Sequence, residues 1–206
     1  MNFGTLGAGF GGLGRGGAAP EPPNLLQKTD AFNDAYWLKA FVTVTANAGV
    51  GPSGSTTAEL MSEDTNNNVH VVYKTISLAA GIYTLSTFFK PDALTRGALC
   101  LSSPDGSKFT ALINAQTGVI IETHDTGTPV SSAAEIVAAG QGFYRIGVTM
   151  YCTTGSVGIN IATAASDTPA YAASGVPTYL GTSSGIYIAG AQLELSPSMT
   201  SYKPVA

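Results

Sequence analysis

Short segments of alternating or β-branched residues, separated by turn signals, fill the chain from Asn24 onward. Val, Ile, Thr, Tyr and Phe favour strands, and their alternation turns one side of each strand toward a core. The Gly, Pro, Asn and Asp clusters between these segments are typical of turns. The segments expected to form strands are VTVTAN (42–47), HVVYKTISL (70–78), IYTLSTFF (82–89), ALCLS (98–102), FTALINA (109–115), FYRIGVTMY (143–151), SVGINIA (156–162) and GIYIAGAQLEL (185–195).

Eight or more short strands without a long amphipathic helix predict an all-β fold, an antiparallel two-sheet jelly-roll sandwich. The composition agrees, because 25 of the 206 residues are Gly and only 11% are charged. Helices need Ala, Leu, Glu and Lys on their exposed faces instead. One short helical turn is expected at residues 30–37, with Asp30 as its N-cap.

Residues 1–17 (MNFGTLGAGFGGLGRGG) follow a different pattern. Each glycine inside a helix destabilises it by about 1 kcal/mol relative to alanine, so an isolated helix is not expected here. Prolines in residues 18–23 predict a stiff, extended spacer. We therefore predict two parts, an arm with its linker (1–23) and a jelly-roll domain (24–206). Four apolar side chains of the arm are candidates for contact with a partner: Phe3, Leu6, Phe10 and Leu13.

The binding energy of such an arm is limited. Burying its four apolar side chains contributes roughly 2 kcal/mol each, whereas ordering its backbone costs at least ~1 kcal/mol per residue. A bound arm therefore needs backbone hydrogen bonds to its partner, or several arms that engage together. A leader without any partner remains the alternative.

Charge and hydropathy exclude several classes of protein. Nine Lys and Arg residues against thirteen Asp and Glu residues give a net charge of −4. No basic patch is available to neutralise phosphates, so we expect no nucleic-acid partner. No run of about 18 apolar residues occurs, so we expect no membrane insertion, and the first residues do not resemble a secretory signal. Cys100 and Cys152 lie in strand-like segments and are expected as buried thiols, with their pairing left open.

Two glycine motifs lack the context that their chemistry needs. Residues 7–12 (GAGFGG) match the dinucleotide-binding pattern, but no strand precedes them and no helix follows. Residues 181–185 (GTSSG) match the nucleophile elbow of hydrolases, but a strand follows the serine. His70 and His124 both precede this motif, whereas a hydrolase histidine would follow it. We therefore expect neither a nucleotide cofactor nor a serine hydrolase.

The run Asp64-x-Asn66-x-Asn68 begins like a calcium-binding loop. Val69 replaces the required glycine and Thr75 the bidentate glutamate, which excludes an EF-hand. A structural calcium in another loop remains open, and no other cofactor is expected. Carboxylate pairs for glycoside cleavage have no specific spacing, so we expect no enzyme. The carboxylates considered for such pairs are Glu122, Asp125, Glu135 and Glu194.

Six blocks of the chain resemble, in order, the head spike fibre domains of tailed phages and related phage-like particles. Phe143 and Ala189 stand where that family often has tryptophan. The blocks are residues 24–39 (NLL, DAFN and WLK), 42–64, 80–90 (AGIYTLS and a lysine), 142–145 (GFYR), 184–194 (SGIYIAGAQLE) and 200–204 (TSYKP).

The resemblance implies a jelly roll similar to carbohydrate-binding modules, displayed on the surface of a virion. We expect a virion structural protein, a head or tail decoration, whose residues 1–23 attach it to other virion proteins. We also expect a homo-oligomer and a host polysaccharide as ligand. The alternative is a structural adaptor that joins virion components and binds no glycan.

Glycan contacts are predicted from residue type alone. Aromatic rings stack on the apolar faces of sugars, and amides and carboxylates bind the hydroxyls. For Trp37 a packed position at the edge of the sandwich competes with this function. Gly181 and Gly190 are expected at bulges or close strand contacts. The candidate glycan contacts are Tyr36, Trp37, Tyr73, Tyr151, Tyr171 and Tyr179.

Overall fold

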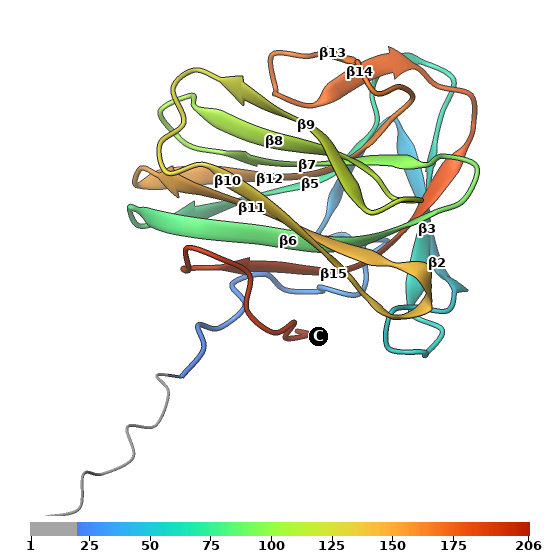
Figure 1. Ribbon diagram of the computed structural model, residues 1–206, viewed down its shortest axis with the longest axis horizontal. Coiled ribbons are helices and arrows are strands. Elements are labelled where there is room, and N and C mark those ends of the chain that lie inside the picture. The colour runs from blue at the N-terminus through green and yellow to red at the C-terminus, as the bar shows by residue number, and fades with distance from the viewer. Residues whose placement is uncertain (1–19) are drawn as a thin grey trace, which may run out of the picture.

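Two six-stranded antiparallel sheets face each other in the computed structural model, which describes residues 20–206 (Figure 1). Sheet A has the strand order β1-β5-β12-β7-β8-β9, and sheet B the order β10-β11-β6-β15-β3-β2. This arrangement is the predicted jelly-roll sandwich. The strands are β1 (Leu38–Ala40), β2 (Val42–Gly49), β3 (Ala58–Glu63), β4 (Asn67–Val69), β5 (Val71–Leu78), β6 (Gly81–Pro91), β7 (Arg96–Ser102), β8 (Lys108–Asn114), β9 (Val119–Thr126), β10 (Ala133–Ala138), β11 (Tyr144–Cys152), β12 (Gly155–Ala164), β13 (Ala170–Tyr171), β14 (Pro177–Leu180) and β15 (Gly185–Glu194).

All eight predicted strands are confirmed, whereas the expected helical turn at residues 30–37 is wrong. This segment forms consecutive turns, in which the N–H groups of Ala31, Asp34 and Trp37 each donate to the carbonyl oxygen three residues earlier. The single helix within residues 20–206 is the short 3₁₀ element η1 (Gly140–Gly142). Tertiary contacts of the turns explain the difference, because the carboxylate of Glu59 accepts the N–H of Asn33 at 3.1 Å.

The inner faces of the two sheets bury the main hydrophobic core. Leu26, Phe32 and Trp37 belong to the same core, although they precede the first strand. The chain therefore closes one end of the sandwich with aromatic side chains before it enters the sheets.

Strand β3 carries two buried carboxylates on either side of Met61. Glu59 accepts a hydrogen bond from the turns at residues 30–37. Glu63 accepts the N–H of Thr182 at 2.7 Å and the hydroxyl of Tyr179. Because buried carboxylates need such partners, each glutamate fixes a loop at one end of the strand.

The two ends of the described chain are joined on one side of the sandwich. The amide of Asn24 donates to the carbonyl oxygens of Ala191 and Lys203, both at 2.9 Å, and its oxygen accepts the N–H of Leu193. In Figure 1 these segments lie beside β15, on the side of the molecule opposite β13 and β14. Asn24 thus ties the start of the domain to its C-terminal segment.

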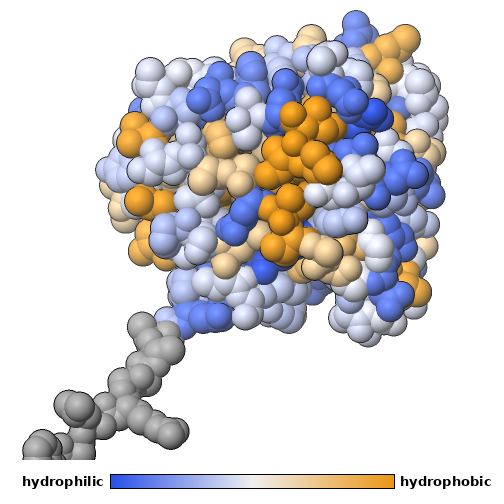
Figure 2. Space-filling view, viewed as in Figure 1, coloured by the Kyte–Doolittle hydropathy of each residue, from blue (hydrophilic) through white to orange (hydrophobic). Residues whose placement is uncertain are grey.

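Strands β13, β14 and β4 form a small third sheet. Val176, which precedes β14, packs on Val71, Ala98 and Leu112, so part of the outer face of sheet A is covered. Figure 2 shows an apolar stripe on another side of the molecule, over the edge strands β9 and β10, where Val119 and Val137 are exposed. Within residues 20–206 no helix has the length and apolarity that a membrane crossing requires.

Candidate functional site

The six predicted aromatic residues do not come together in the structure. Trp37 is buried in the core and donates from Nε1 to the carbonyl oxygen of Lys28 at 2.9 Å. The prediction that it stacks on a sugar is therefore corrected, because its ring already packs against Phe32 and Tyr36. Tyr36 is half-buried, with the ammonium group of Lys74 at 4.1 Å from its ring centre.

Tyr171 and Tyr179 are engaged by neighbours within the protein. The ring of Tyr171 stacks on His124 at 3.8 Å, and its hydroxyl donates to Glu122 at 2.6 Å. Tyr179 packs on His70 and donates to a buried carboxylate of β3. Tyr151 is exposed near the end of β11 in sheet B, whereas Tyr171 and Tyr179 belong to the small third sheet. These contacts give the rings of Tyr171 and Tyr179 structural roles.

Of the six predicted glycan contacts, Tyr73 lines a hollow on the surface of the domain. This hollow, here called the Tyr73 hollow, has a volume of about 200 Å³ and lies on the outer face of sheet A. Its lining is mainly aliphatic, with the amide of Asn160, the hydroxyl of Ser174 and the phenol of Tyr73 as polar groups. The lining residues are Ala40, Val69, Val71, Tyr73, Asn160, Ser174 and Val176.

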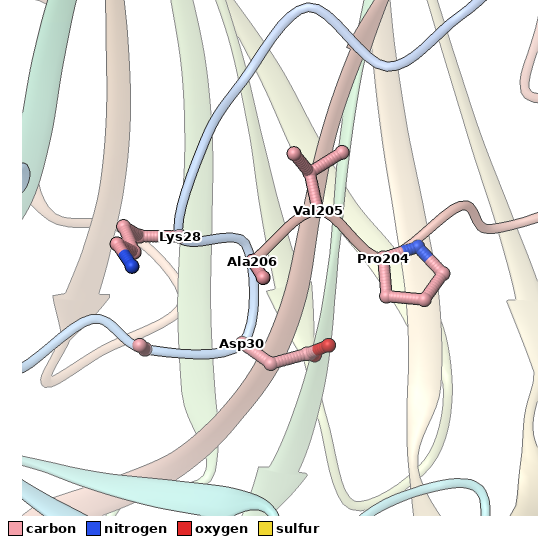
Figure 3. Close-up of a pocket in the computed structure, with 6 residues that line it drawn as sticks. Lys28, Asp30, Pro204, Val205 and Ala206 are labelled. Carbon is pink, nitrogen blue, oxygen red and sulfur yellow. The ribbon is translucent and has the colours of Figure 1, made fainter.

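Two larger hollows adjoin each other beside the joined chain ends and share Asp30 and Pro204. One of about 540 Å³ is lined by Lys28, Asp30, Ala31, Pro204, Val205 and Ala206 (Figure 3). The other, of about 400 Å³, is lined by Asp30, Pro52, Ser53, Ser55, Thr57, Phe88, Gly190, Tyr202 and Pro204. We call the pair the Asp30 hollow. In Figure 3 the side chain of Asp30 extends toward Pro204, and that of Lys28 extends in another direction.

The turn that presents Asp30 is held by several elements. The carbonyl oxygen of Lys28 accepts hydrogen bonds from Ala31 N–H and from the Trp37 indole, and the carbonyl oxygen of Thr29 accepts the N–H of Ala191. A site fixed in this way loses little conformational entropy when it binds a ligand. Trp37 therefore acts from below the site, as a support for the Asp30 turn.

Tyr202 forms one wall of the hollow. Its hydroxyl donates to the Thr29 hydroxyl at 3.0 Å, and its ring packs edge-on against Phe88 at 5.4 Å. Burial, together with the nearby carboxylate of Asp30, raises the pKa of the Tyr202 hydroxyl, so the ring carries no charge at neutral pH. Gly190 leaves room for this ring, because a Cβ there would lie 2.8 Å from its Cζ atom.

Gly190 and Gly181 both occupy the predicted kinds of position. Gly190 has a φ of +50° and lies where the pairing of β15 with β6 shifts register, which confirms the predicted bulge. At Gly181 an added Cβ would overlap the carbonyl oxygen of Asp64, which confirms a close approach of two backbones.

The Asp30 hollow combines groups that suit uncharged polyols. Its two halves offer the Asp30 carboxylate, the Lys28 side chain, the hydroxyls of Ser53, Ser55 and Thr57, and apolar walls of proline and tyrosine rings. A carboxylate and hydroxyls bind sugar hydroxyls, and rings contact the C–H faces of a pyranose. Sequence reasoning missed this site because its lining residues come from five separate segments, and no motif joins them.

No group of three or more His, Cys, Asp or Glu side chains suited to a metal occurs within residues 20–206. Asp64, which begins the calcium-like run, accepts hydrogen bonds from the backbone and the side chain of Asn66. The predicted arm contacts at Phe3, Leu6, Phe10 and Leu13 lie outside the described residues.

No protein-family model matches the sequence, and no curated protein matches it. The resemblance to head spike fibre domains therefore stays a prediction. Among solved structures, the enzymatically active domain of tailspike protein 4 from bacteriophage CBA120 is similar, with a TM-score of 0.47 and 16% identity. The match covers 84% of this chain and 21% of that one, so the chain spans about a fifth of the tailspike domain.

Two carbohydrate-binding modules are also similar to this chain. TmCBM61, solved with β-1,4-galactotriose, matches with a TM-score of 0.40 and 14% identity over 84% of this chain and 99% of that one. CBM35 from Cellvibrio japonicus Abf62 matches with a TM-score of 0.37 and 12% identity over 79% and 94% of the two chains. At such identities function must be inferred from this chain's own hollows.

Proposed function

We propose that this protein is a virion structural protein, a head or tail decoration, whose jelly-roll domain binds a host surface polysaccharide at the Asp30 hollow. The observation that supports the binding step is the convergence of the Asp30 carboxylate, three hydroxyls and the Tyr202 ring on one preformed hollow. The domain binds without cleaving its ligand, and it requires no cofactor.

The two adjoining halves of the hollow suit consecutive units of a sugar chain. Asp30 stands where they meet, so its carboxylate accepts hydrogen bonds from hydroxyls of one unit or of both. Charge-assisted hydrogen bonds of this kind contribute more than neutral ones. The Asp30 carboxylate repels acidic sugars, and the Lys28 side chain extends in another direction, which favours a neutral polysaccharide (Figure 3).

Binding is tested by titrating the full chain with neutral and acidic surface polysaccharides, followed by product analysis. The variant D30N is expected to weaken binding about tenfold or more, because the amide removes the negative acceptor. The variant D92N alters an exposed carboxylate outside the hollow and serves as the matched control. Equal binding by D30N and D92N would contradict the proposed site, and a shortened polymer would contradict a function without catalysis.

Residues 1–23 attach the protein to the particle, and the arms of several protomers engage together. Weak single sites gain affinity when a homo-oligomer presents several of them. The full chain and a chain that starts at Asn24 are each added to particles that lack this protein. Sedimentation of only the full chain with the particle supports the arm as anchor, and sedimentation velocity of the free protein tests the oligomer.

A structural adaptor is the second candidate function. It is favoured by the C-terminal segment that lines the Asp30 hollow, which lies on the same side of the sandwich as residues 20–24 (Figure 1). A virion partner on that side would cover the hollow. Equal sedimentation of both chains with the particle, together with no polysaccharide binding, would support the adaptor.

A further inference from the structure

One row of side chains crosses the whole outer face of sheet A. The strand register places Leu38 opposite Tyr73, and Tyr73 opposite Asn160. The row continues through Cys100 and Thr110 on β7 and β8. Leu38, at one end of the row, is 51% exposed, and Cys100 is buried. The row is thus open at the β1 edge and covered at its middle.

The cover is the turn at residues 172–176, which is fixed to the sheet. Ala172 N–H donates to the carbonyl oxygen of Val176, and Gly175 N–H donates to that of Ala172. The Thr110 hydroxyl donates to the carbonyl oxygen of Gly175 at 2.7 Å and binds the turn to β8. Ser174 and Val176 therefore form a rigid wall of the Tyr73 hollow.

The chemistry of the Tyr73 hollow differs from that of the Asp30 hollow. No charged side chain is among its lining residues, four of which are aliphatic. Its polar groups are the Asn160 amide, the Ser174 hydroxyl and the phenol of Tyr73. With a volume of about 200 Å³ it is smaller than the roughly 300–1,000 Å³ of sites for drug-sized ligands. It therefore suits one sugar unit rather than a chain.

We propose that the Tyr73 hollow is a second binding site, which takes a single N-acetylated hexosamine unit. The acetyl methyl group packs against Val69, Val71 and Val176, and the C–H face of the pyranose lies on the ring of Tyr73. The amide of Asn160 pairs with the acetamido group, whose N–H and C=O match the acceptor and donors of an asparagine side chain. An unsubstituted hexose leaves the aliphatic wall without a partner.

The two hollows lie on opposite sheets, so one domain contacts two different sugars at once. Sheet A and its small third sheet lie on the side away from the joined chain ends (Figure 1). The Tyr73 site therefore remains accessible even where a partner covers the side that carries the Asp30 hollow. It requires neither the Asp30 hollow nor attachment to a particle.

The test is saturation-transfer NMR on the full chain with three probes: the methyl glycosides of N-acetylglucosamine, glucosamine and glucose. Transfer is expected for the N-acetylated probe, strongest at its acetyl methyl protons, and about tenfold less for the others. The variants Y73A and N160A are expected to reduce it about tenfold. N160A changes a half-buried polar group and is the safer variant for folding.

The matched controls separate this site from others. Y151A removes an exposed tyrosine from sheet B and is expected to leave the transfer unchanged. D30N removes the contribution of the Asp30 hollow, so the three probes are also compared in this variant. Equal transfer to all three probes in D30N, full transfer in folded N160A, or loss of transfer in Y151A would each overturn the proposal. Failure of polysaccharide binding at Asp30 would leave the result for the Tyr73 site unaffected.

Discussion

The guanidinium group of Arg145 donates a hydrogen bond of 2.6 Å from Nη1 to the carbonyl oxygen of Thr200. Its Nη2 donates to the hydroxyl of Ser86 at 2.8 Å. The buried carboxylate of Glu194 accepts the N–H of Thr200 at 2.9 Å, and the side chain of Gln192 bonds to Lys203 N–H at 2.7 Å. Residues of three separate sequence blocks thus hold the C-terminal segment on sheet B.

Replacing Arg145 by lysine is expected to lower the free energy of unfolding by about 2 kcal/mol or more. A lysine cannot bond to Thr200 and Ser86 together in the fork geometry of a guanidinium. The measurement is urea unfolding, with hydrogen exchange at Thr200. The matched control is R96K, because Arg96 forms an exposed ion pair with Asp167 and its loss costs at most about 1 kcal/mol. Equal effects of the two variants would contradict a special role for Arg145.

Gly190 is expected to tolerate no side chain. The variant G190A places a methyl group against Tyr202 and Phe88 in a backbone with positive φ, and a loss of about 2–4 kcal/mol in the free energy of unfolding is expected. Gly54 also has positive φ, but no atom lies within 4 Å of an added Cβ, so G54A measures the backbone strain alone. Thermal or urea unfolding gives the loss of stability in each variant, and the loss in G190A minus the loss in G54A is the cost of the steric overlap. A smaller loss of unfolding free energy in G190A than in G54A would contradict the predicted steric overlap at Gly190.

The sequence predicts eight strands correctly, because most of them alternate or are rich in β-branched and aromatic residues. The prediction lacks β1, β3, β4, β9, β10, β13 and β14. Of these, β3 lies inside sheet B, whereas β9 and β10 each form one edge of a six-stranded sheet. The segment of β9, VIIETHDT, does not alternate, and its register shifts within the strand. The sequence predicts a helical turn at residues 30–37 because Asp30 resembles an N-cap. The competing bond from Glu59 comes from β3, and no local pattern reveals it.

The site is much less predictable from the sequence than the fold. By residue type, Tyr73 and Trp37 are equally good candidates for sugar contacts. The structure distinguishes them by burial, because Tyr73 lines a hollow and Trp37 lies in the core. The Asp30 hollow needs the pairing of Thr29 with Val205, residues far apart in the chain. Tyr202 lies in the terminal block that resembles a phage family, which was a usable signal. That block is held on sheet B by Arg145, Glu194 and Gln192, and its Tyr202 supplies one wall of the hollow.

The stability of the domain is expected to carry a pH dependence from Glu59. Burial raises the pKa of this carboxyl, and the N–H groups of Phe32 and Asn33 oppose the shift only in part. An acid with a raised pKa in the folded state favours folding most when protonated, and that contribution is lost as the pH rises through the folded pKa. The variant E59Q removes the titration. Relative to the wild type, E59Q is therefore expected to gain stability as the pH rises from about 4 to 7.

The measurement is the urea midpoint of both proteins across this pH range. E21Q is the matched control, because Glu21 is exposed and pairs with Lys203 at the surface. A stability difference between E59Q and the wild type that is independent of pH, or that moves in the other direction, would contradict the prediction.

Cys100 and Cys152 are both free in the structure, and they lie on different sheets. Cys152 belongs to the main core, whereas Cys100 faces outward beneath the turn at residues 172–176. Burial raises the pKa of the Cys152 thiol to about 12, and it raises that of Cys100 as well. Because the thiolate is the reactive form, we expect neither thiol to react with a disulfide reagent at pH 8 in the folded protein, and both to react in denaturant.

The variant S53C supplies an exposed thiol and is expected to react at least about a thousandfold faster than either native cysteine. Recovery of fewer than two thiols after unfolding without reductant would contradict the free state of both cysteines. Fast labelling of Cys100 alone would show that the turn at residues 172–176 opens in the folded protein. The wall of the Tyr73 hollow would then be mobile. Slow labelling of Cys100 supports a rigid wall, which the hydrogen bond from Thr110 on β8 to Gly175 indicates.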